Sequence, residues 1–183
     1  MIAFVGLGNT GIKYGKTKHN AGFWILEEWA KRHNLKFKPG NGEFVFAKSK
    51  KWKVILVKPV TGMNNSGTAI KEVVKSWDLA DSEILVVTDD VDLPLGSIRI
   101  KPKGGDGCHR GLENIIYHLN SNQFPRLKFG IGTKENMRPA EKYVLKPFKK
   151  ENSKEVEIAI NKAVDALDSI LVNGLSYTMN YFN

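Results

Sequence analysis

The chain has 183 residues, of which 42% are hydrophobic and 26% are charged, a balance that is ordinary for one globular domain. Its formal net charge of +9 favours a polyanionic partner, nucleic acid before a membrane surface, although a merely lysine-rich protein is the alternative. A single cysteine excludes an intrachain disulfide and a cysteine-based zinc site. Since we find neither a signal sequence nor an apolar run of spanning length, we expect one cytoplasmic domain over residues 1–183 with no membrane partner.

The chain opens with an apolar run, Ile2–Val5, which predicts a buried strand. Three glycines follow it in a G-x-G-x-x-G pattern, at Gly6, Gly8 and Gly11. This pattern indicates dinucleotide binding only where a helix begins within it. The next helix signal is Asn20, which we expect to cap a helix over residues 21–34. We therefore interpret the glycines as a turn that presents Asn9, although a nucleotide-dependent oxidoreductase stays open as an alternative.

Strand and helix patterns alternate along the rest of the chain. Apolar or alternating runs predict strands over residues 43–48, 52–58, 84–88, 97–101 and 126–131. Helical periodicity predicts helices over residues 66–77, 112–119, 140–144 and 151–172, with Ser66 capping the first and Gly174 ending the last before a short C-terminal segment. This order predicts a single-domain α/β fold with a mixed, mostly parallel central sheet and helices on both faces.

Unusual polar groups follow the strands, where open α/β sheets bind ligands. Each group has a simple structural explanation: a histidine before a helix is often a surface residue, paired asparagines often cap a helix, and an acidic run forms a solvated turn or a divalent-metal site. Together they supply a histidine, a carboxylate to orient it, and amides to meet an oxyanion. The candidates are Asn9, His19, Asn64, Asn65, Asp89, Asp90, Asp92, His109 and Arg110.

The same segments resemble, in order, the motifs of bacterial peptidyl-tRNA hydrolases. The resemblance covers residues 2–148, and the total length also fits. The matching stretches are VGLGNTGIKY at residues 5–14, TKHNAG at 17–22, KPVTGMNNSG at 58–67, DDVDLPLG at 89–96, KGGDGCHRGL at 103–112 and RLKFGIG at 126–132. The first two stretches form one opening motif, so the match consists of five ordered motifs and is specific. The resemblance implies an enzyme that hydrolyses the ester between peptide and tRNA, acting as a monomer on peptidyl-tRNA without a cofactor or metal.

The resemblance also implies a role for each matched residue. His19 would be the general base that activates a water, and Asp89 would orient it and raise its basicity. Asn9 would distinguish a blocked from a free amino end, and Asn64 would position substrate and water. The implied substrate and tRNA contacts are Tyr14, Gly62, Met63, Asn64, His109 and Arg110 in the cleft, with Lys101, Lys128 and, as a further candidate, Arg126 at the 5′ phosphate end of tRNA.

Three positions depart from the family's pattern: Thr10, Gly62 and Arg110. Proline is usual at the first, an aromatic residue is common at the second, and asparagine is usual at the third. Arginine adds charge and cannot accept a hydrogen bond, so the family's contact to the substrate's end does not carry over to Arg110. The sequence is also compatible with an RNA-binding module that has lost catalysis, and with a cysteine hydrolase that uses Cys108 beside His109.

Overall fold

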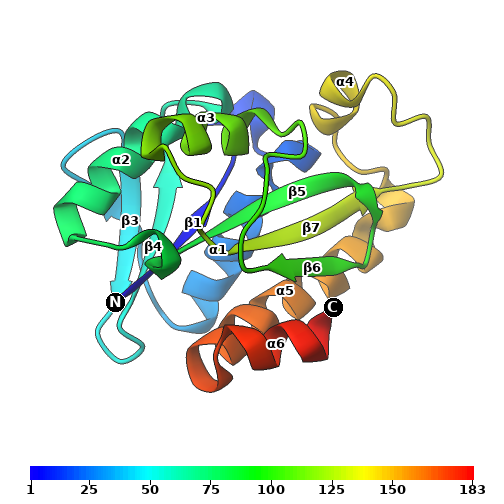
Figure 1. Ribbon diagram of the computed structural model, residues 1–183. Helices are drawn as coiled ribbons and strands as arrows, with labels where there is room; N and C mark the ends of the chain where they lie inside the picture. The colour runs from blue at the N-terminus through cyan, green and yellow to red at the C-terminus, as the bar shows by residue number, and fades with distance from the viewer.

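The computed structural model describes all residues 1–183 and contains one seven-stranded sheet (Figure 1). The strands are β1 (Ile2–Gly6), β2 (Lys38–Pro39), β3 (Phe44–Ser49), β4 (Val54–Pro59), β5 (Ile84–Pro94), β6 (Ile98–Lys101) and β7 (Arg126–Gly132). Their order is β2-β3-β4-β1-β5-β7-β6. The four central strands β4, β1, β5 and β7 run parallel, while β2 and β3 at one edge and β6 at the other pair antiparallel. The predicted mixed sheet with a parallel centre is confirmed.

Helices cover both faces of the sheet, as predicted (Figure 1). The α-helices are α1 (Ala21–Arg32), α2 (Ser66–Trp77), α3 (Arg110–Leu119), α4 (Ala140–Val144), α5 (Ser153–Asn173) and α6 (Leu175–Phe182), and the 3-10 turns are η1 (Ile12–Tyr14), η2 (Lys18–Asn20), η3 (Met63–Asn65), η4 (Asp81–Glu83) and η5 (Lys150–Asn152). Side chains alternate across each strand, so Phe4 of β1 packs in the core with α1 and α5, whereas Ala3 and Val5 pack in the core with α2 and α3.

The structure differs from the sequence expectations at four places. Residues 38–39 form the short edge strand β2, which the sequence did not predict. The C-terminal segment is a helix, α6, and the side chain of Asn183 beyond it accepts from the Ile100 N–H at 2.7 Å and donates to the Ile100 carbonyl at 2.9 Å on edge strand β6. Strand β5 continues past Thr88 to Pro94. Neither Asn20 nor Ser66 caps its helix with a side chain, because both side chains bond elsewhere. No helix of the protein has the length and hydropathy needed to cross a membrane.

The glycine turn after β1 serves close packing. A Cβ on Gly6 would lie 2.4 Å from the Gly22 carbonyl oxygen, and a Cβ on Gly22 would lie 2.5 Å from the Leu7 nitrogen. The end of β1 therefore crosses the start of α1 at backbone contact, which only glycine permits. Because α1 begins at Ala21, ten residues after Gly11, its N-terminus does not face the turn in the manner of a dinucleotide site.

Candidate active site

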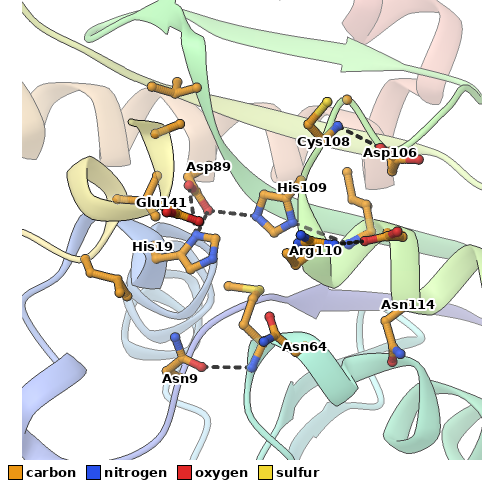
Figure 2. Close-up of a pocket in the computed structure, with 18 of the residues that line it drawn as sticks. Asn9, His19, Asn64, Asp89, Asp106, Cys108, His109, Arg110, Asn114 and Glu141 are labelled. Atoms are coloured by element: carbon orange, nitrogen blue, oxygen red, sulfur yellow. Dashed lines mark hydrogen bonds and ion pairs between the residues drawn. The ribbon is translucent and has the colours of Figure 1, made fainter. Parts of the chain in front are cut away.

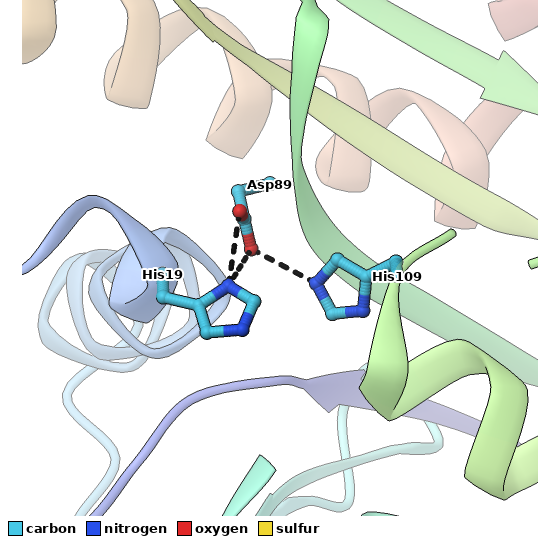
Figure 3. A group of neighbouring side chains, drawn as sticks. All are labelled: His19, Asp89 and His109. Carbon is cyan, nitrogen blue, oxygen red and sulfur yellow. Dashed lines mark hydrogen bonds and ion pairs between the residues drawn. The ribbon is translucent and has the colours of Figure 1, made fainter. Parts of the chain in front are cut away.

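Asp89 lies between two histidines at the carboxyl side of the parallel strands (Figure 3). Its two carboxylate oxygens each lie 3.0 Å from His19 Nδ1, and Oδ1 also lies 3.0 Å from His109 Nε2. The Asp89 side chain is 2% exposed. Burial by itself would raise the pKa of this carboxyl group, but the charges and hydrogen bonds of His19 and His109 outweigh it and hold the pKa well below its ordinary value. Asp89 is therefore a buried anion with two donors.

The second nitrogen of each ring separates the roles of the two histidines. His19 donates through Nδ1 to Asp89, which leaves the Nε2 lone pair free on the cleft side. In His109, Nδ1 accepts from the Leu112 N–H at 3.4 Å, so its proton lies on Nε2 and is shared between Asp89 and the Thr88 hydroxyl at 2.7 Å. We assign these tautomers from the hydrogen-bond partners. Only His19 has a free basic nitrogen.

Asn9 is held in place by three hydrogen bonds to Met63 and Asn20. Its Oδ1 accepts from the Met63 N–H at 2.8 Å, while the Asn20 side chain accepts from its backbone N–H at 2.8 Å and donates to its carbonyl at 2.9 Å. The Asn9 Nδ2 group has no protein acceptor and lines the cleft. The expected cap, Asn20, thus orients the glycine turn instead, which the sequence did not indicate.

The two asparagines lie on the same side of the histidine pair. Figure 2 shows Asn9 and Asn64 together, across His19 and His109 from Asp89. Asn64 is exposed in the short turn η3, whereas its neighbour Met63 is buried at 3% and packs beneath Gly111 of α3. Gly62 precedes them with φ +82, a conformation that favours glycine. The chain brings these residues, predicted from separate motifs, into one cleft of about 1450 Å³ with His19.

Arg110, one of the three departures from the family pattern, lies at the rim of this cleft. Arg110 begins α3, its side chain is 72% exposed, and Nη1 donates to Glu113 Oε2 at 3.1 Å. Cys108 is exposed beside His109, but both ring nitrogens of His109 already have partners, so His109 does not activate the thiol. Further residues line the cleft that the sequence did not single out, because α3 and α4 come together only in the folded chain. They are Glu113, Asn114, Tyr117, Glu141, Val144 and Leu145.

The carboxylates of the acidic run after Thr88 do not form a cluster. Asp90 accepts from Lys128 Nζ at 2.8 Å, and Asp92 pairs with Arg138 at 3.0 Å. The ligand atoms close enough to share a metal are those of His19, Asp89 and His109, within 4.8 Å of one another. The facing ring nitrogens of both histidines donate to Asp89, so the arrangement is accounted for by hydrogen bonds.

The candidate tRNA contacts share one face of the β6–β7 pair. Lys101 lies opposite Arg126 in the ladder and Arg99 lies opposite Lys128, so all four cationic residues are on the same side of the sheet. Lys101 and Arg99 are exposed and Lys128 is 15% exposed. The sequence reasoning missed Arg99, although it alternates with Lys101 across Ile100.

Arg126 differs from its three neighbours because it is fully buried. Its Nη1 donates to the Gly105 carbonyl at 3.3 Å, its guanidinium stacks 4.6 Å from the Phe124 ring, and Nε and Nη2 have no partner. Burial lowers the pKa of the guanidinium. The glycine loop before His109 covers it, so a direct phosphate contact by Arg126 needs that loop to move.

The comparisons with known proteins agree over the whole chain. The family model described as peptidyl-tRNA hydrolase matches residues 3–183. A peptidyl-tRNA hydrolase of Geobacillus thermodenitrificans is 40% identical over 185 residues, covering 100% of both chains, and one of Aquifex aeolicus is 41% identical, covering 98% of this chain and 94% of its own. A crystal structure of the Acinetobacter baumannii peptidyl-tRNA hydrolase matches with a TM-score of 0.92 and 31% identity, covering 100% of this chain and 94% of the other. Since fold, length and sequence all agree with these relatives, the chain belongs to the peptidyl-tRNA hydrolase family.

Proposed function

We propose that this chain hydrolyses the ester that joins the last carbonyl of a peptide to a ribose hydroxyl of tRNA, releasing free tRNA for reuse in translation. One observation carries the proposal: Asp89 orients His19 through Nδ1, and the Nε2 of His19 is free on the side of the cleft. This is the arrangement that a general base requires. Membership of the peptidyl-tRNA hydrolase family supports the choice of substrate.

The reaction needs no protein nucleophile. His19 Nε2 takes a proton from a water, and the hydroxide oxygen bonds to the ester carbonyl carbon to give a tetrahedral oxyanion. The intermediate collapses when the bond from that carbon to the ribose oxygen breaks, and the His19 imidazolium returns the proton to the leaving oxygen. Asp89 stabilises the imidazolium while it exists. General-base assistance of this kind contributes about 10²–10⁴-fold to the rate.

The cleft amides fit the remaining tasks. The free Nδ2 group of Asn9 and the side chain of Asn64 lie across the histidine pair from Asp89, where they are placed to donate to a carbonyl oxygen or hold the water (Figure 2). Fixed donors aimed at a developing oxyanion are worth more than mobile ones, because they need no reorganisation. We assign Asn64 to substrate and water, and Asn9, held by Met63 and Asn20, to recognition of the blocked amino end.

The remaining substrate contacts follow the cleft and the sheet edge. Tyr14, Gly62, Met63, His109 and Arg110 line the cleft, and His109 acts mainly through Asp89. Lys101 and Lys128 are assigned to phosphates of the tRNA. Arg126 joins them only when the glycine loop lifts from it. We further propose a monomer that acts in the cytoplasm, where translation releases peptidyl-tRNA; sedimentation of the purified protein tests the monomer.

The decisive experiment is turnover by the purified protein. N-acetyl-aminoacyl-tRNA is the blocked substrate and the same aminoacyl-tRNA without the acetyl group is the control. We expect release of the N-acetyl-amino acid, with far slower release from the unblocked control. Binding of both tRNAs without turnover would instead establish the RNA-binding module. Saturable binding of a nicotinamide dinucleotide would favour an oxidoreductase.

A further inference from the structure

Lys18 is a buried cation that the proposed reaction does not use. It directly precedes His19 in η2, and it is 1% exposed. No carboxylate lies within ion-pair distance of its ammonium group. Burial lowers the pKa of Lys18, and Glu135 partly offsets this effect from a greater distance. A buried ammonium group needs hydrogen-bond acceptors in place of water.

The acceptors of Lys18 all come from one distant segment, residues 143–148. Its Nζ donates to the Pro147 carbonyl at 3.0 Å and lies 3.5 Å from the Lys146 carbonyl. The ammonium also lies 4.0 Å from the ring centroid of Tyr143 and 5.2 Å from that of Phe148. The Lys18 side chain thus makes four contacts to this segment. The two carbonyl groups that it contacts belong to residues 128 and 129 positions further along the chain.

The backbone reinforces the same connection. The Lys18 N–H donates to the Lys146 carbonyl at 3.1 Å, and Thr17 forms an isolated β-bridge with Pro147. The segment has further attachments elsewhere: the Tyr143 hydroxyl donates to the Ile131 carbonyl at 2.6 Å and lies 3.0 Å from the Thr133 hydroxyl, and Val144 and Phe148 pack against the core. Residues 145–147 are themselves exposed. Lys18 is therefore the main side-chain tie between this segment and η2.

The tied segment forms one wall of the cleft. Ala140, Glu141, Val144 and Leu145 line it from α4 and the residue after α4, opposite Arg110 and Tyr117 on α3. Glu141 of this wall lines the same cleft as His19 and Asp89 (Figure 2). His19 has its own anchor in Asp89, so it does not depend on Lys18 for its orientation. Leu145 at the end of the wall is exposed, and the two carbonyls that Lys18 contacts, those of Lys146 and Pro147, directly follow it.

We propose that Lys18 is a positioning residue that fixes the α4 wall of the cleft to the turn carrying His19, and so sets the width of the substrate site. The kinetic part of this inference rests on the proposed function. Because the wall contacts substrate rather than the reacting water, loosening it removes binding shared by the ground and transition states. Such a loss raises KM and leaves kcat nearly unchanged.

The test compares three variants on the blocked tRNA substrate. Lys18→Met keeps the length and apolar stem but removes the donors, and we expect KM to rise about tenfold with kcat within about threefold of the wild type. Lys18→Arg restores donors for both carbonyls and should recover most of the KM. Lys16→Met removes an exposed cation of the same loop and should leave KM unchanged. A fall in kcat at constant KM, or no kinetic change in folded Lys18→Met, would overturn the proposal.

Hydrogen exchange followed by mass spectrometry gives a second readout that needs no activity. Lys18→Met should speed exchange of amides in residues 140–148 while the peptide containing Ile84–Thr88 keeps its protection. Unchanged protection of residues 140–148 would also overturn the inference. If the wild-type protein shows no hydrolysis, the proposed function fails while this measurement still decides the role of Lys18.

Discussion

Two loops bring a histidine to the same carboxylate, yet only one of them leaves a basic nitrogen free. The turn η2 presents His19 through Nδ1 and leaves Nε2 free in the cleft, whereas the glycine loop presents His109 through Nε2 and places its Nδ1 at the start of α3. The difference lies in one backbone N–H, that of Leu112. Both histidines are held by the same acceptor, Asp89. They differ in chemistry because the second ring nitrogen of His109 has a hydrogen-bond partner and that of His19 has none.

Removal of His19 should produce the largest effect. His19→Ala takes away the only free basic nitrogen beside Asp89, so we expect hydrolysis to fall by about 10² or more. Folding should survive, because the residue lies at a turn before α1. Turnover of blocked aminoacyl-tRNA, with circular dichroism as the folding control, measures this. Near-normal turnover in the folded variant would end the general-base mechanism.

Asp89→Asn should have the next largest effect, because it keeps the shape of the side chain and removes its charge. Loss of the charge that stabilises the His19 imidazolium should reduce kcat, by less than the loss of His19 itself. Turnover of the blocked aminoacyl-tRNA by the folded variant measures this, and an unchanged kcat would show that the charge of Asp89 does not support His19.

The same variant also tests the pH dependence of stability. The folded-state pKa of Asp89 is below its ordinary value of 3.8, so its ionisation stabilises the fold at pH values above 3.8. This contribution is lost as pH falls below 3.8 toward the folded-state pKa. The difference in Tm between wild type and Asp89→Asn should therefore be full at about pH 7 and shrink in acid. A difference that grows in acid would contradict the assignment.

Replacement of His109 sharpens the comparison of the two loops. Glutamine retains a donor for Asp89 but no basic nitrogen, so His109→Gln should reduce kcat by about tenfold or less, well short of the loss for His19→Ala. The two variants are compared on the same substrate at the same pH. Equal losses would mean that both rings transfer protons, and the tautomer argument would be wrong.

The cationic face of β6 and β7 should affect binding and not chemistry. Neutralising Lys101 and Lys128 to Gln should weaken tRNA binding and make its salt slope shallower by up to about 2. Hydrolysis of a short aminoacyl-nucleotide fragment should stay nearly unchanged. Lys101→Gln alone is the control, since Lys128 also bonds Asp90 next to the active site. Equal losses on fragment and whole tRNA would place these lysines in the catalytic centre.

Arg110→Asn should give the smallest change. The arginine is exposed at the cleft rim and already pairs with Glu113, and we predict that it also binds a phosphate or base near the 3′ end of the tRNA. The variant should change turnover only modestly and lower the salt dependence of binding by about one phosphate contact. Affinities of both proteins at two salt concentrations decide this. Parallel salt dependences would show that Arg110 contacts no phosphate.

The sequence by itself determined the fold class and the family. Hydrophobic periodicity placed the central strands and most helices, because burial of one face imposes a regular spacing on the chain. Five motifs identified the family, which the comparisons confirm. The assigned roles of His19, Asp89, Asn9 and Asn64 stay predictions until the variants are measured.

Only the tertiary structure decided which groups have partners. No spacing rule connects Lys18 to Pro147 or Asn20 to Asn9. Arg126 and Lys128 have similar sequence surroundings, yet one is buried beneath a glycine loop and the other pairs with Asp90. Periodicity reports which face is buried, whereas the burial and hydrogen bonding of a single polar group depend on segments that meet only after folding.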